Sequence, residues 1–337
     1  MDVPVQIPAG TLAWLLEPAD PGVRFLALRD LCRLPESDPQ LREARREAHR
    51  AGPIAAVLAG MEEPGFWMKP GPGYNPKYRS TVWALILLAQ LGAAVDEDER
   101  IARACTYLLD HALTPGGQFT ATGAPSGTID CLQGNLCWAL SALGCRDERL
   151  EGAYQWMARS ITGDGVAPRE DQKAAVRYYA GQCGPGFACG GNYGEPCAWG
   201  AVKEVLALAQ KPAPQRSRLE QEAAAAGVDF LLGVDPATAG YPSGPAGRPN
   251  RSWWKFGFPV FYITDVLQIL EALAAHGLGA DPRLATLRAL ILGKRDAQGR
   301  WRLEYDYSGK TWVEFGEKGQ PNKWVTLRAL RALEKAA

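Results

Sequence analysis

The sequence lacks an excess of charge of either sign, because 37 lysine and arginine residues balance 37 aspartate and glutamate residues. Proteins that bind nucleic acid need a basic patch or stripe, and no basic block occurs along the chain. Long hydrophobic runs are also missing, since the most apolar stretch, residues 82–95, is too short to cross a bilayer. Residues 1–10 show neither the basic nor the apolar region of a signal peptide. We therefore expect a cytoplasmic protein with no transmembrane segment and no nucleic-acid partner.

Histidine is scarce, with three residues in 337, whereas the chain has eight cysteines. His49, His111 and His276 fall inside or at the ends of expected helices, and we interpret them as structural. A metal site built on histidine is therefore not expected, and nothing in the sequence indicates a nucleotide cofactor. In the cytoplasm, where disulfides are rare, eight cysteines are more often free thiols or metal ligands.

One pattern recurs along the chain at an irregular period of roughly 50–70 residues. An apolar helix ends near Leu-Gly, a short polar link follows, and an amphipathic helix then leads into a loop with glycine and aromatic residues. Residues 78–92 are apolar nearly all round, as in a helix buried on every side. Residues 101–112 instead carry a single apolar stripe. Alternation of buried and half-buried helices predicts two concentric layers.

The count of these helices predicts a closed all-α barrel. Buried candidates begin near Val23, Tyr78, Cys131, Cys197, Phe258 and Lys323, and half-buried candidates begin near Thr11, Asp38, Glu99, Arg149, Arg218 and Asp281. Six such hairpins give an (α/α)6 toroid of two concentric rings of six helices, in a single domain spanning residues 1–337. We expect the inner helices to be parallel and to enclose a central pocket that opens at the end with the glycine- and cysteine-rich loops.

Four cysteines are candidate metal ligands. Cys131 and Cys197 lie at the starts of two inner helices that should be neighbours, and Cys183 and Cys189 lie in the loop between them. A helix N-terminus favours the thiolate, and thiolates bind zinc or iron–sulfur clusters. We predict a metal site at these four residues, with zinc the first choice and an iron–sulfur cluster the second. The alternatives are packing and a disulfide; Cys32, Cys105, Cys137 and Cys145 are assigned to packing.

Aromatic residues gather where a cavity is expected. The candidates for substrate binding are Trp253, Trp254, Phe256, Phe258 and Tyr262, which lead into the fifth inner helix, and Tyr178, Tyr179 and Trp199, which flank the cysteine loop. Aromatic faces can bind an apolar chain or stabilise a carbocation, although aromatic residues also fill cores. Lys255 and Arg177 stand beside aromatic residues and are candidates for a phosphate contact, and Arg79 falls on an inner helix.

Two aspartates are candidate catalytic residues. Asp265 lies in the apolar segment VFYITDVLQILEAL, which we expect to be an inner helix. Burial would raise the pKa of this carboxyl and allow it to act as an acid; Lys203 and Arg79 are its candidate partners, and a hydrogen-bonded structural role is the alternative. Asp130 directly precedes Cys131 at a helix start.

The helical hairpins, the loops GGQF and GRWRLEY and the six-fold barrel resemble the prenyltransferase/squalene-oxidase repeat proteins. This family includes class II terpenoid cyclases and the β subunits of protein prenyltransferases. The segments CGPGFACGGNYGEPCAWGAVK and SGKTWVEFGEKGQPNKWVTLRALRAL look like a bacterial branch of it. The resemblance implies an α/α toroid and an isoprenoid or similar lipid as ligand.

The family's catalytic motifs are only partly present. The sequence has neither the Asp-x-Asp-Asp motif of class II cyclases nor the Asp-Asp-x-x-Asp motif of class I cyclases. Asp130 and Cys131 match the position of the zinc-binding aspartate and cysteine of protein prenyltransferases, but the zinc-binding histidine has no counterpart. Two functions therefore stay open: a cyclase- or prenyltransferase-like enzyme with a cysteine-ligated metal, or a non-catalytic binding or scaffold protein. Glycan-processing enzymes also use such barrels and would show paired inner carboxylates.

Overall fold

The computed structural model describes residues 6–167 and 181–336. These residues form α-helices joined by loops and short 3-10 turns, and they contain no β-strand beyond isolated bridges. The expectation of an all-α protein is thus confirmed for the described part of the chain. The helices are α1 (Ala9–Leu15), α2 (Pro21–Asp30), α3 (Pro39–Arg50), α4 (Gly52–Ala59), α5 (Thr81–Gln90), α6 (Glu99–Ala112), α7 (Asp130–Ala142), α8 (Arg149–Thr162), α9 (Ala198–Leu208), α10 (Arg218–Leu232), α11 (Val266–Ala275), α12 (Ala285–Gly293) and α13 (Lys323–Glu334). Within the same two ranges, no helix combines the length and the apolarity needed to cross a membrane.

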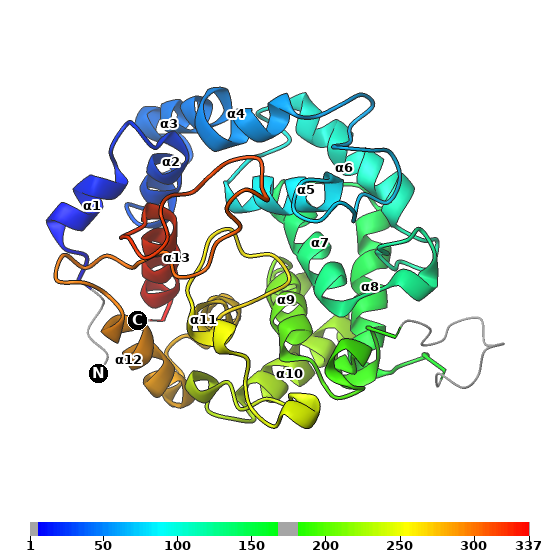
Figure 1. The fold of residues 1–337 in the computed structure, drawn as a ribbon. Helices are drawn as coiled ribbons and strands as arrows, with labels where there is room; N and C mark the ends of the chain where they lie inside the picture. The colour runs from blue at the N-terminus through cyan, green and yellow to red at the C-terminus, as the bar shows by residue number, and fades with distance from the viewer. Residues whose placement is uncertain (1–5, 168–180, 337) are drawn as a thin grey trace.

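The helices form an inner and an outer set (Figure 1). Helices α2, α5, α7, α9, α11 and α13 lie around the centre, and the others lie outside them. Around the centre, α5 packs on α7, α7 on α9, α9 on α11, α11 on α13, and α13 on α2. Outside, α3 packs on α2, α6 on α5, α8 on α7, α10 on α9, and α12 on α11. Five of the six inner helices are therefore covered by a helix that adjoins them in sequence, and the exception is α13.

Helix α13 joins the two ends of this arrangement. It contacts α1 as well as α2. Lys323 at its start pairs with Glu17 at 2.7 Å and with Asp20, and Arg331 near its end pairs with Asp30 of α2 at 3.0 Å. Apolar packing and ion pairs thus hold together two segments from opposite ends of the described chain.

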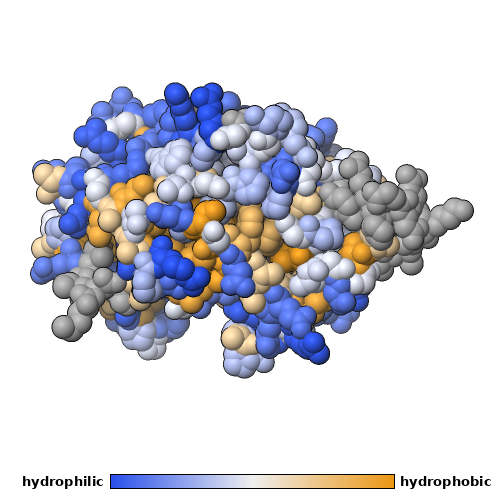
Figure 2. All heavy atoms as spheres, turned by 90° about the horizontal axis from the view of Figure 1, so that it is seen from below, coloured by the Kyte–Doolittle hydropathy of each residue, from blue (hydrophilic) through white to orange (hydrophobic). Residues whose placement is uncertain are grey.

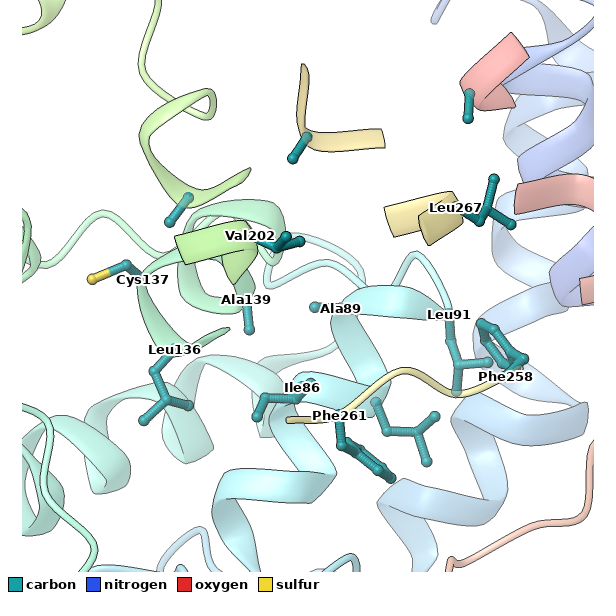
Figure 3. Packing of buried hydrophobic residues seen from close by; sticks show 14 of the residues in the cluster. Ile86, Ala89, Leu91, Leu136, Cys137, Ala139, Val202, Phe258, Phe261 and Leu267 are labelled. Atoms are coloured by element: carbon teal, nitrogen blue, oxygen red, sulfur yellow. The ribbon is translucent and has the colours of Figure 1, made fainter. Parts of the chain in front are cut away.

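The difference between the two sets follows from their side chains. Every residue of α5 from Thr81 to Ala89 is buried, whereas α6 buries one face and leaves Arg100 and Arg103 on the other at least partly exposed. Figure 3 shows buried side chains of α5, α7, α9 and α11 meeting in one core. The expected contrast between a fully apolar helix and a one-sided helix is confirmed for this pair.

The outer helices keep their apolar side chains half-buried rather than exposed. Figure 2 views the molecule from below Figure 1 and shows hydrophobic atoms in a central band between hydrophilic margins. Helices α10 and α12, lowest in Figure 1, contribute half-buried residues such as Phe230 and Leu290. Among the described large apolar side chains, only Met68 and Tyr193 are exposed.

The fifth inner helix begins later than its sequence suggests. Helix α11 begins at Val266, with Asp265 as its N-cap, and not near Phe258. The segment before α11 contains Pro259, which has no N–H to donate to a helix. Side chains from other helices hold this segment: Gln90 contacts both the N–H and the carbonyl of Val260, and Arg328 donates to the carbonyl of Gly257. A short apolar run does not distinguish helix from extended chain by periodicity alone. Helix α4, which follows α3 almost directly, was also not expected.

Helices α7 and α9 approach each other closely because Gly134 has no side chain. A Cβ atom at Gly134 would lie 2.5 Å from the backbone nitrogen of Glu204 and 2.8 Å from the Cβ of Lys203. On the other side of the contact, a Cβ at Gly200 would lie 2.9 Å from the Cβ of Asp130. The sequence-based expectation that these two helices are neighbours is confirmed, and the two glycines set their separation.

Replacing Gly134 by alanine is expected to lower the free energy of unfolding by about 1–3 kcal/mol, because the new methyl group would force the two backbones apart. Gly152 of α8 is the matched control, since a Cβ there would meet nothing within 4 Å. Gly152→Ala should leave stability unchanged or raise it by about 0.5–1 kcal/mol through helix propensity. Urea denaturation of both variants tests this. Equal effects at the two positions would contradict the proposed role of Gly134.

Candidate functional site

The structure places the candidate cysteines at the amino ends of α7 and α9. Cys131 is the second residue of α7, Cys197 is the N-cap of α9, and Cys183 and Cys189 lie in the connecting segment. The four thiols divide into separate groups. Cys189 and Cys197 lie near each other, and their thiols shift each other's pKa. Cys183 is buried against α8, where its sulfur lies 3.2 Å from Ser160 Oγ.

These positions do not fit the predicted four-thiolate metal centre. Across residues 6–167 and 181–336, no group of three or more cysteine, histidine, aspartate or glutamate side chains is placed to hold a metal ion. Cys183 packs with Trp156 in a small cluster of its own, apart from the main core. The zinc or iron–sulfur site stays a prediction from the sequence, and we derive no chemistry through a metal.

The thiol environments differ from those expected at helix starts. Burial raises the pKa of Cys131 to about 12, although the nearby charge of Lys203 lowers it. The hydrogen bond to Cys189 raises the pKa of Cys197, and burial raises it further. Of these three thiols, the loop residue Cys189 is the one with a lowered pKa. The Cys197 thiol and the N–H groups of Gly191 and Asn192 bring this pKa to about 6, against the effect of burial. Both thiols at the helix starts thus have raised pKa values, chiefly through burial at Cys131 and through the neighbouring thiol at Cys197.

A pair of buried carboxyl groups lies between α7 and α9. Asp130 and Glu204 are 2% and 1% exposed, and their carboxylate oxygens have no well-formed hydrogen bond among the described residues. Burial raises the pKa of Asp130, while the Cys183 thiol and the Gly184 N–H lie near enough to lower it. Burial and the charge of Asp130 raise the pKa of Glu204. The two groups titrate as a pair, and burial favours the protonated form of each.

Glu204 was not singled out from the sequence. It follows Lys203 in the apolar helix AWGAVKEVLAL, and this adjacent pair of charges in an otherwise apolar helix was the available signal. Both side chains are buried. Burial lowers the pKa of Lys203 to about 7, although the charge of Asp265 raises it.

Asp265 is held by different partners from those expected. Its two carboxylate oxygens accept hydrogen bonds from Arg328 at 3.1 Å each, and one of them also caps α11 at the N–H of Gln268. Lys203 donates instead to Gln268. Arg79 donates to the carbonyl of Thr311 and lies over the ring of Trp312. Neither expected partner contacts Asp265, and this geometry fits a structural ion pair better than a proton donor.

The aromatic candidates have different environments. Phe256 and Phe258 are core residues, and Phe258 stacks on Trp324 at 4.7 Å between ring centroids. Tyr262 shares a hydrogen bond with Tyr78, and Trp254 donates to the carbonyl of Ala237. Lys255 is exposed. Tyr178, Tyr179 and Arg177 lie outside the described residues.

Trp199 and Trp253 line a cleft at the amino end of α9. Its volume is about 590 Å³, within the range of small-molecule sites. Its walls include the aromatic residues Tyr193, Trp199, Tyr241 and Trp253, together with Cys197, Arg248 and Arg251. The rings of Trp199 and Trp253 are 6.4 Å apart, and those of Tyr241 and Trp253 are 5.7 Å apart.

The centre of the molecule is filled at this same end. Trp83, Phe261 and Tyr307 are almost fully buried there. The ring centroid of Phe261 lies 5.3 Å from that of Trp83 and 4.9 Å from that of Tyr307. A central pocket of about 160 Å³ lies instead at the carboxyl ends of the inner helices, among Gln90, Ala275 and Lys335. The expected opening at the cysteine-loop end is therefore wrong for the central pocket, because aromatic side chains fill that end.

Residues from the last turns of α2, α5, α11 and α13 line the central pocket, so these helices end on the same side of the molecule. Arg29, Arg328, Arg331 and Lys335 lie around it with Glu271. Helix carboxyl ends carry partial negative charge, which explains this concentration of cations. The charged groups share the lining with apolar residues, among them Trp138, Phe258 and Trp324.

No protein-family model matches the chain, and a search of curated proteins finds no significant match. The choice among functions therefore depends on the site itself.

Proposed function

We propose that the protein is an (α/α)6 toroid that binds an isoprenoid-like ligand with an anionic head group in the cleft at the amino end of α9. The observation that carries this proposal is the meeting of aromatic walls with two exposed arginines in one cleft. The inner and outer sets of helices support the toroid, with α4 as an addition to the outer set.

Each part of the cleft corresponds to one part of such a ligand. The rings of Trp199, Tyr241 and Trp253 offer an apolar surface to a hydrocarbon chain. Arg248 and Arg251 form no ion pair within the described ranges, so their charge is available to an anion such as a diphosphate. The amino end of α9 adds partial positive charge to the same place.

The geometry favours binding over catalysis. The buried acid pair of Asp130 and Glu204 lies behind the first turn of α9, where the Cβ of Asp130 faces Gly200, while Cys197 and Trp199 face the cleft. Cyclase- or prenyltransferase-like chemistry is the second candidate, supported by this pair because a protonated buried carboxyl is an acid held ready at neutral pH. It would require the first turn of α9 to move.

Thermal unfolding with farnesyl diphosphate, farnesol, squalene and pyrophosphate tests the binding proposal. Farnesyl diphosphate should stabilise the protein most, by about 2.7 kcal/mol at a hundredfold excess over its dissociation constant, because it alone engages both the rings and the arginines. Mass spectrometry of the ligand afterwards distinguishes binding from turnover.

The double variant Arg248→Ala/Arg251→Ala should weaken binding of farnesyl diphosphate about tenfold or more, since hydrogen bonds to charged groups contribute about 1.5–3 kcal/mol each. Arg218→Ala on α10, an equally exposed arginine outside the cleft, is the control and should bind as the wild type does. Equal loss in both proteins, or no stabilisation by any of the ligands, would contradict the proposal.

A further inference from the structure

The thiols of Cys189 and Cys197 meet at the base of a short hairpin. Its two arms are joined by the Ala188–Pro196 bridge and by backbone hydrogen bonds from Cys189 to Glu195 (3.2 Å) and from Cys197 to Phe187 (2.8 Å). The Gly194 N–H also donates to the carbonyl of Cys189 at 2.9 Å. These bonds fix both cysteine backbones, so the contact between the thiols does not depend on a flexible tail.

The two thiols lie close enough to shift each other's pKa, and neither is in a disulfide. The nearby N–H groups of Gly191 and Asn192 favour the thiolate of Cys189. Cys197 lines the cleft, and both residues are partly exposed. A small oxidant that enters the cleft can therefore reach the pair.

We infer that Cys189 and Cys197 form a redox-active dithiol that closes to a reversible disulfide on reaction with a low-molecular-weight disulfide. The Cys189 thiolate attacks one sulfur of the oxidant, forms a mixed disulfide and releases one thiolate. The Cys197 sulfur then attacks Cys189 Sγ, forms the intrachain bond and releases the second thiolate. Two electrons pass from the protein to the oxidant, and the two protons of the cysteines end on the two released thiols.

Closure of this disulfide would fix one wall of the cleft. The loop between the two cysteines carries Asn192, whose side chain donates to the carbonyls of Pro196 and Pro242 at 2.8 Å and 3.0 Å. Tyr193 on the same loop packs against Gly244. The inference itself is independent of the ligand proposed for the cleft.

A second thiol contact offers a matched comparison. Cys105 and Cys145 also shift each other's pKa, but Cys105 is 1% exposed, only Cys145 is partly exposed, and neither lines the cleft. Thiol–disulfide exchange needs access to the attacked sulfur. Oxidation at the cleft, where both cysteines are partly exposed, should therefore precede any reaction of Cys105 with Cys145.

The test is a thiol count on the reduced full-length protein before and after incubation with oxidised glutathione. We expect loss of two thiols, recovered with dithiothreitol, and a disulfide between the peptides separated by cleavage after Glu195, which lies between the two cysteines. Cys189→Ser and Cys197→Ser should each abolish this loss and leave at most a glutathione adduct. Cys105→Ser should behave as the wild type does.

Three results would overturn the inference. They are an unchanged thiol count in the wild type, loss of two thiols that persists in Cys189→Ser, and a disulfide that maps to Cys105 and Cys145. The metal content of the protein purified without added metal is measured in parallel. About one equivalent of zinc or iron that blocks the reaction until it is chelated would assign these thiols to a metal site and also count against a dithiol.

Discussion

Arg328→Met is expected to lower the free energy of unfolding by about 3–5 kcal/mol, the cost of removing one partner from a buried ion pair. Arg328 is 6% exposed and binds both oxygens of Asp265 at 3.1 Å. It also binds Glu271 at 2.9 and 3.0 Å and the carbonyl of Gly257 at 2.6 Å. Without the guanidinium group, the carboxylates of Asp265 and Glu271 lose the only cation that they share among the described residues.

Urea denaturation measures this loss of stability, and two further variants serve as comparisons. Arg328→Lys keeps the charge but cannot reproduce the two-pronged geometry, so it should recover only part of the stability. Arg283→Gln removes an arginine from an exposed pair with Asp281 and should have no measurable effect. If Arg328→Met were as stable as the wild type, the ion pair would not hold α11 and α13 together.

Glu204→Gln is expected to change the free energy of unfolding in the opposite direction. It should stabilise the protein at pH 8 by about 1–3 kcal/mol, the usual cost of an unsatisfied buried group. Burial raises the pKa of Glu204 above its unfolded value of about 4.3. Between these two pKa values the folded chain holds a proton that the unfolded chain has released, so wild-type stability falls as the pH rises. Glutamine does not ionise, and its advantage should therefore disappear near pH 4–5.

Glu220 of α10 is the matched control for this prediction. It is equally buried, but it pairs with Lys211 at 2.6 Å and completes the capping box of α10 by accepting from the N–H of Ser217. Glu220→Gln should lower stability by about 1.5–3 kcal/mol because it removes charged hydrogen bonds. Unfolding of both variants at pH 5 and pH 8 tests the pair. A destabilised Glu204→Gln protein at pH 8 would show that the Glu204 carboxylate has a favourable partner.

The sequence was informative wherever the period of apolar residues decides the structure. The all-α class, the fully buried α5 and the contact between α7 and α9 were all expected from that period. It was less informative in the segment before α11, because Phe258 and Phe261 are as apolar as helix residues. There, backbone contacts from Gln90 and Arg328, distant in sequence, determine the conformation.

The candidate site was predicted by residue type more reliably than by arrangement. Cys131 and Cys197 were correctly expected at helix starts, but burial and the Cys189 thiol raise their pKa values, and the lowered pKa is that of Cys189. Asp265 was expected to have Lys203 or Arg79 as its partner, yet Arg328 approaches it from a helix more than 50 residues away. The buried acid pair instead involves Asp130 and Glu204, whose proximity depends on Gly134 and Gly200. Such contacts between helices leave no periodic signal in the chain.

The contact between α13 and α2 has a consequence for the order of folding. Lys323 and Asp20, which meet there, are 303 residues apart in sequence. Each of the other inner contacts joins helices separated by a single hairpin and can form early, because little chain entropy is lost in closing a short loop. The α2–α13 contact is thus expected to form last. By the same argument, it is where partial unfolding of the native protein should begin, with amides of α13 exchanging hydrogen before those of α7 and α9.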